Sequence, residues 1–389
     1  MTLRHLWAAA LVCVGLAACG GSSDGGGGGI GGTGGTLHVQ LTDAPSCGYD
    51  AVNITVDRVR VHQSPTASDS DAGWSEIVLS PARRVDLLTL SNGVLEDLGQ
   101  TALPAGTYTQ LRLVLAANDA TNPFANSVVP TGGSETALTT PSAQQSGLKM
   151  NVHIDVPANK IADVVLDFDA CKSVVKRGNS GQYNLKPVIT VVPVLSDAGL
   201  RVVGYLDPTL AADTTQVSLQ QAGVVVKATA PNSAGQFVLY PVPIGSYDLV
   251  VTSAGRATVV ITGVPVVDTA FTTLNGTATP FVPPSSATRT VTGTVTPATA
   301  TVRALQTLTG GPSIEAAWAA VDATSGAFSV DLPIAAPLRA AYAAGSTPTF
   351  TPDSTAAGKY LLEAASAGAT KTQAIDANAA VPPVTFTFP

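Results

Sequence analysis

Asp167 and Asp169 are the two side chains best spaced for chemistry. They alternate with apolar residues in Val164-Val165-Leu166-Asp167-Phe168-Asp169, and in an extended strand this spacing puts both carboxylates on one face, about 7 Å apart. Such a pair could bind Ca²⁺ with further oxygen ligands, or serve as the acid and base of a glycoside hydrolase. The pair could also be solvated or neutralised by one of three basic residues: Arg112, Lys149 or Lys186. We expect this last, structural role, keep Asp167 and Asp169 as metal candidates, and expect no cofactor.

The remaining residue types offer no catalytic motif. His38, His62 and His153 each occupy the polar position of an alternating segment, which predicts solvated surface histidines. A nucleophilic serine elbow, a zinc-binding helix and a phosphate-binding loop are all missing from the sequence. We therefore expect a non-catalytic protein. A carbohydrate-active hydrolase that uses the acidic pair is the alternative.

The N-terminus carries the signals of export. Arg4 and His5 precede an apolar run from Leu6 to Leu16, which is too short to span a membrane and is typical of a signal peptide. The following Leu16-Ala17-Ala18-Cys19 resembles the lipobox of bacterial lipoproteins. The resemblance implies cleavage after residue 18, acylation of Cys19 and attachment to a membrane of the cell envelope.

The residues after Cys19 predict a flexible tether. Gly20 to Thr36 is mostly glycine, and such a chain should span about 23 Å as a coil. Gly20 stands where inner-membrane lipoproteins often carry Asp, which favours the outer membrane, facing the periplasm or the cell surface.

Two other cysteines remain in the exported chain. Cys13 leaves with the signal peptide and Cys19 takes the lipid, so Cys47 and Cys171 could form one disulfide. Two unpaired thiols are the alternative, because the sequence does not show how far apart the two residues lie.

Composition limits the class of protein. Of 389 residues, 12% are charged and 45% are hydrophobic, and the formal net charge is −7. Nucleic-acid binding needs a basic surface that this chain cannot easily build, and disorder needs fewer apolar residues. Apolar residues alternate with polar ones in segments such as 37–41, 52–56 and 148–156. This period of two predicts a mainly β protein made of tandem antiparallel sandwiches behind the tether.

Residues 37–196 resemble a family of unknown function. The segments that carry the resemblance are Val39 to Pro45, Trp74, Val85 to Leu90, Leu103 to Leu113, Val165 to Ala170 and Leu185 to Ile189. They are similar in order and spacing to domain of unknown function number forty-three eighty-two, which is common in bacterial lipoproteins. The resemblance implies a secreted, β-rich domain with no settled activity.

Two further modules follow. Residues 200–284, with Phe237 and Pro243-Ile244-Gly245-Ser246-Tyr247, resemble carboxypeptidase-regulatory-like or transthyretin-like sandwiches. Residues 287–389 repeat the pattern in diverged form, with Phe328 and Tyr360 at the matching places. Such modules usually act as spacers or binding domains, so we expect a binding or structural role. The expected partners are the membrane through the lipid and a glycan or an envelope protein, without nucleic acid.

Overall fold

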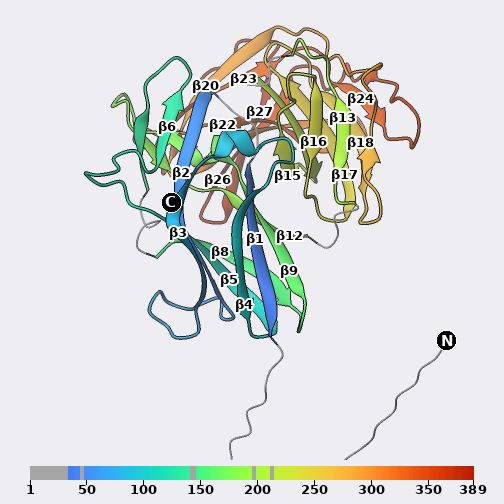
Figure 1. Cartoon of the computed structure of the whole chain (residues 1–389). Helices are drawn as coiled ribbons and strands as arrows, with labels where there is room; N and C mark the ends of the chain where they lie inside the picture. Colours follow the sequence, from blue (N-terminus) through green and yellow to red (C-terminus); the bar gives the residue numbers. More distant parts are fainter. Residues whose placement is uncertain (1–33, 44–47, 141–145, 195–198, 211–213) are drawn as a thin grey trace, which may run out of the picture. The chain divides into compact units, whose positions relative to one another are not determined.

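The computed structural model describes residues 34–43, 48–140, 146–194, 199–210 and 214–389, in which the regular elements are almost all strands (Figure 1). The short helices in this part of the chain are η1, a 3₁₀ helix (Leu87–Leu90), and α1 (Ala170–Ser173). Thr33–Pro389 forms one compact unit. The predicted fold class, mainly β with tandem sandwiches, is confirmed. Residues 20–33 of the predicted tether lie outside the described residues, but its predicted end is wrong, because Gly35 and Thr36 already belong to the first strand.

The first sandwich packs a four-stranded sheet, in the order β12-β9-β1-β4, on an eight-stranded one. The smaller sheet consists of β1 (Gly35–Asp43), β4 (Glu96–Leu103), β9 (Ile161–Phe168) and β12 (Ile189–Val194). The larger sheet consists of β2 (Tyr49–His62), β3 (Ser75–Asp86), β5 (Gly106–Leu115), β6 (Ser127–Pro130), β7 (Thr136–Thr139), β8 (Leu148–Val156), β10 (Val174–Lys176) and β11 (Tyr183–Leu185). As the alternation predicts, Leu37, Val39 and Leu41 are all buried between the sheets.

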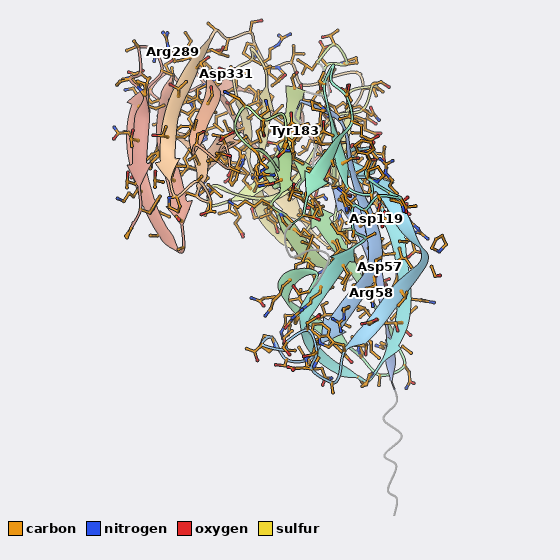
Figure 2. The ribbon with its side chains drawn as sticks, turned by 90° about the vertical axis from the view of Figure 1, so that its left-hand side faces the viewer. Asp57, Arg58, Asp119, Tyr183, Arg289 and Asp331 are labelled. Carbon is orange, nitrogen blue, oxygen red and sulfur yellow. The ribbon has the colours of Figure 1, made fainter. Side chains whose placement is uncertain are left out.

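The long strand β2 organises the larger sheet. It pairs with β3 on one side and with β5 and β6 on the other. A bulge between Val56 and Arg58 lets Asp57 leave the ladder, and the Arg58 Nε donates to the Asp57 carboxylate at 2.7 Å. Figure 2 shows both residues on this strand, whereas Arg289 and Asp331 belong to the last sandwich.

The second and third sandwiches share one strand order. In the second, β16 (Gln236–Leu239), β13 (Val202–Tyr205) and β19 (Thr272–Thr273) form one sheet, and β15 (Val224–Thr229), β14 (Thr215–Gln221), β17 (Gly245–Ser253) and β18 (Val259–Val266) begin the other. The third matches it with β23 (Ala327–Pro333), β20 (Thr288–Thr296) and β28 (Val384–Thr387), and with β22 (Ser313–Ala319), β21 (Thr301–Thr307), β26 (Lys359–Ser366) and β27 (Ala369–Asp376). In each three-stranded sheet, the central strand (β13 or β20) also has one parallel neighbour, which is β19 or β28.

The two sandwiches also share a packing detail. Gly204 pairs with Phe237, and Gly293 pairs with Phe328. A Cβ atom at either glycine would lie 2.4 Å from the facing phenylalanine ring, so only glycine fits beneath the ring. The matching contacts support the repeat inferred from the aromatic positions.

One segment of the third region crosses into the second sandwich. β24 (Leu338–Ala341) pairs in parallel with β18, and β25 (Thr351–Pro352) pairs with β24. This segment, which is rich in Ala and Pro, extends the second sandwich's larger sheet to six strands. We call β24 and β25 the strap. Because of the strap, residues 287–389 do not form a sheet system separate from residues 200–284.

Candidate functional site

The acidic residues gather where β1 and β9 end. The strands run parallel, with Thr42 opposite Asp167 and Asp43 opposite Phe168. β9 does not alternate at this end, because Val164 to Phe168 are all buried. The face that carries Asp167 is therefore covered, although the spacing alone allowed it to face solvent. Asp43, Asp167 and Asp169 together form what we call the acidic cluster.

Asp167 is neutralised by a lysine of the second sandwich. The Nζ atom of Lys227, on β15, donates to the Asp167 Oδ1 atom at 2.6 Å. The two side chains are only 2% and 9% exposed. Burial raises the pKa of Asp167, while the charge and hydrogen bond of Lys227 act in the opposite direction. The pair is therefore a buried ion pair between two sandwiches.

The prediction that Arg112, Lys149 or Lys186 neutralises the acidic pair is wrong. The guanidinium of Arg112 lies beside Asp69 and donates to the carbonyl oxygens of Ala67 and Ser146. The ammonium groups of the other two donate to carbonyl oxygens, Lys149 to Pro65 and Lys186 to Thr299. Lys227 could not be chosen from the sequence, because its strand lies in a separate module 60 residues further along the chain.

Asp169 caps α1 and lies at one end of a series of ion pairs. Its Oδ1 atom accepts from the backbone N–H of Lys172 at 3.0 Å, and burial raises its pKa. The Lys172 Nζ atom then lies 2.8 Å from Glu315 on β22. Arg303 lies beside Glu315 and Glu363, at 3.3 and 2.7 Å. Charged contacts therefore join the first sandwich to the third.

Asp43 precedes Ala44-Pro45, a position that predicts a turn-forming side chain, but the structure gives it a different role. Its side chain is buried, and its Oδ1 atom accepts from the backbone N–H of Ala170 at 2.8 Å. Its Oδ2 atom is buried without a hydrogen-bond partner. Burial raises the pKa of Asp43 well above its ordinary value, and the charges of Asp169 and Asp167 add to this effect. A proton on Asp43 would lower the charge of the acidic cluster.

The second and third sandwiches are also joined by a pair of amide hydrogen bonds. The Gln220 side chain accepts from the backbone N–H of Glu315 at 2.7 Å and donates to its carbonyl oxygen at 2.8 Å. Gln220 therefore mimics a neighbouring strand. Polar contacts of this kind fix relative orientation, because each buried donor and acceptor needs its partner.

The acidic cluster does not line three prominent pockets of the described part of the chain. None of the three pockets is lined by Asp43, Asp167 or Asp169. Among the described residues, no group of three or more His, Cys, Asp or Glu side chains could hold a metal ion. Asp167 joins the first sandwich to the second through Lys227, and Asp169 contacts the lysine that pairs with Glu315 of the third.

The histidines take three different environments. His38 lies between two carboxylates, with Nδ1 2.6 Å from Asp163 and Nε2 3.1 Å from Asp97. The Nδ1 atom of His62 accepts from the backbone N–H of Ser64 at 2.8 Å, and His153 is largely exposed. Only His153 matches the expected solvated position.

The predicted cysteine sites fall mostly outside the described residues. Cys19 and Cys47 both lie there, so lipidation and the pairing of Cys47 with Cys171 stay predictions. Cys171, at the second position of α1, is disulfide-bonded. In the part of the chain that the structure describes, no helix is long and apolar enough to cross a membrane.

The comparison with known families matches the first sandwich. Residues 34–187 match the Domain of unknown function (DUF4382). The DUF4382 resemblance expected for residues 37–196 is confirmed over this range, which covers almost all of the first sandwich. No curated protein matches the chain.

Solved structures with a local likeness include two chains from crystals of type II cohesin–X–dockerin complexes of Acetivibrio cellulolyticus. One complex carries an N-terminal interface mutant and the other a C-terminal interface mutant. The identities are 25% and 26%, over 23% and 22% of this chain, with TM-scores of 0.19 and 0.18. The likeness spans 59% and 56% of the length of those chains.

Proposed function

We propose that this protein is a lipid-anchored component of the bacterial cell envelope. Its DUF4382 domain and two following sandwiches act together as a non-catalytic binding or structural module. Anchoring rests on the lipobox-like Leu16-Ala17-Ala18-Cys19 and the glycine-rich segment behind it. The outer membrane is the proposed location, and a glycan or another envelope protein is the proposed partner.

The observation that carries the non-catalytic role is the ion pair of Asp167 with Lys227. A glycoside hydrolase needs two carboxylates that reach opposite sides of a glycosidic bond. Here one carboxylate is buried against a lysine at 2.6 Å and the other caps a helix. The acidic pair therefore stabilises the assembly of the sandwiches.

The two following sandwiches are proposed as carboxypeptidase-regulatory-like modules. Their common strand order and the Gly204–Phe237 and Gly293–Phe328 contacts support a tandem repeat. In the second sandwich the Tyr247 hydroxyl donates to the Pro243 carbonyl at 2.8 Å, which closes the Pro-x-Gly-x-Tyr turn. Modules of this kind suit a spacer that carries the first sandwich.

Lipid anchoring is tested by metabolic labelling with radioactive palmitate. The wild-type chain should incorporate label, and Cys19→Ser should abolish incorporation and release the protein from membranes. Cys13→Ser is the matched control, since residue 13 should leave with the signal peptide and its replacement should not change the label. Label that persists in Cys19→Ser would contradict the anchoring site.

The hydrolase alternative is tested separately with a panel of aryl glycosides. We expect no turnover by the wild-type protein. Turnover that disappears in the variant carrying both Asp167→Asn and Asp169→Asn would overturn the non-catalytic proposal, provided that circular dichroism shows the variant still folded.

A further inference from the structure

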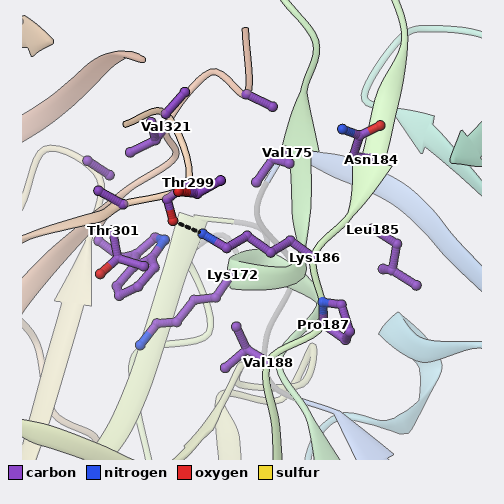
Figure 3. A pocket seen from close by; sticks show the side chains of 15 residues that line it. Lys172, Val175, Asn184, Leu185, Lys186, Pro187, Val188, Thr299, Thr301 and Val321 are labelled. Carbon is purple, nitrogen blue, oxygen red and sulfur yellow. Dashed lines mark hydrogen bonds between the residues drawn. The ribbon is translucent and has the colours of Figure 1, made fainter. Parts of the chain in front are cut away.

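A pocket of about 390 Å³ lies between the first and third sandwiches. Figure 3 shows its side chains, which come from β10, β11 and the residues after β11 on one side and from the third sandwich on the other. Most of the lining is apolar, including Val175, Leu185, Val188 and Val321, and the indole of Trp318 adds an aromatic surface. Its volume falls in the range of small-molecule sites, about 300–1,000 Å³.

Two ammonium groups line this apolar pocket, and only one has a carboxylate partner. Lys172 is paired with Glu315 at 2.8 Å and lies over the ring of Trp318. Lys186 donates to the carbonyl oxygen of Thr299, as the dashed line in Figure 3 marks. Within the described ranges, Lys186 has no carboxylate in ion-pair distance. Lys186 is an exposed residue, and the partial burial of its ammonium by the pocket lowers its pKa.

A second polar group lines the pocket away from this ammonium. Figure 3 shows Asn184 on β11, on the far side of Val175 from Thr299. The Oδ1 atom of Asn184 is buried and has no hydrogen-bond partner. In Figure 3 this oxygen points away from the other side chains of the pocket. The pocket therefore combines apolar walls with one exposed ammonium that has no carboxylate partner among the described residues.

We propose that this pocket binds a small hydrophobic carboxylate. The carboxylate accepts hydrogen bonds from the Lys186 ammonium, and the apolar body of the ligand packs against Val175, Val188 and Trp318. A single unpaired ammonium matches one negative charge. A phosphate dianion would keep an unpaired charge in an apolar site, which is costly. The site goes beyond the proposed anchoring and does not depend on it.

The binding test uses the full chain in buffer that contains zwitterionic lipid vesicles, with the vesicles alone as the blank for partitioning. Ligand-observed NMR titrations measure phenylpropionate and its neutral analogue phenylpropanol. We expect saturable binding of phenylpropionate and at least tenfold weaker binding of phenylpropanol. The titration reports on the pocket whether or not the chain carries a lipid, so its failure would not affect the anchoring proposal.

Variants assign the binding to the pocket. Lys186→Gln removes the charge but keeps an N–H donor for the Thr299 carbonyl, and it should weaken phenylpropionate about tenfold, or about 1.4 kcal/mol. Val188→Trp should fill the pocket and abolish binding while the charge remains. Lys149→Gln is the matched control, because Lys149 also donates to a carbonyl oxygen but lies in a different pocket, and it should leave the affinity unchanged.

Three results would overturn the proposal. They are equal binding of the acid and the alcohol, unchanged affinity in Lys186→Gln, and no saturable binding of phenylpropionate to the folded wild-type chain.

Discussion

Lys227→Met removes the cation of the buried ion pair but keeps the length of the side chain. Asp167 would then be an uncompensated carboxylate in a site where it is only 9% exposed. Removing one partner of a buried ion pair costs about 3–5 kcal/mol, so the free energy of unfolding should fall by this amount at pH 7. The neighbouring buried carboxyl of Asp43 offers no compensating charge.

The loss should depend on pH in a defined direction. Without Lys227, the group that lowers the pKa of Asp167 is absent, so its folded-state pKa rises further above the unfolded value of about 3.9. The folded protein then binds a proton at higher pH than the unfolded chain does. The stability defect is therefore largest near pH 7 and shrinks as the pH falls towards 4.

The assay is urea unfolding of the full chain, followed by circular dichroism at pH 7 and pH 5. The double variant Lys227→Met/Asp167→Asn replaces the ion pair by two neutral groups and should regain at least half of the lost stability. Lys149→Met is the control, because that ammonium lies in an exposed contact with a carbonyl oxygen and its loss should cost less than about 0.5 kcal/mol. A Lys227→Met protein within 0.5 kcal/mol of wild type at pH 7, or a defect equal at both pH values, would refute the reasoning.

Two further predictions concern the first sandwich. Burial lowers the pKa of His38, but its contacts with Asp163 and Asp97 outweigh this and raise it above 6.5. The contribution of His38 to stability is therefore complete below pH 6.5 and lost as the pH rises through the folded-state pKa. His38→Gln should cost about 0.5 kcal/mol at pH 5.5 and less at pH 8.5, as urea midpoints would show; a larger loss at the higher pH would contradict this. For the disulfide, alkylation of the denatured mature protein should label Cys47 and Cys171 only after reduction, and Cys171→Ser should destabilise the protein by up to about 5 kcal/mol. Full labelling without reduction would exclude the bond.

Local sequence patterns predicted the strands well, but they did not predict the contacts between residues far apart in the chain. The alternation in residues 37–41 identified the buried face of β1, and the aromatic positions of Phe237 and Phe328 identified equivalent strands in two sandwiches. The environment of Asp167 depends on the parallel pairing of β1 with β9 and on a lysine from another module. Neither fact leaves a local signal, because a charged residue in a half-buried strand has the same spacing whether water or a second sandwich covers it.

The same limit applies to Asp43. Its place before Ala44-Pro45 is typical of a turn, yet its side chain is buried against the start of α1. Recognising this required knowing that residue 170, on a distant part of the chain, lies beside it.

The strap has a consequence for how this chain could exchange parts with other proteins during evolution. β18 would be an open edge of the second sandwich without β24, and open edges invite pairing with foreign strands. A recombination event near residues 284–287 would carry the strap away with the third sandwich and expose residues 259–262. The second and third sandwiches can therefore be transferred to another protein without exposing this edge only when they move together.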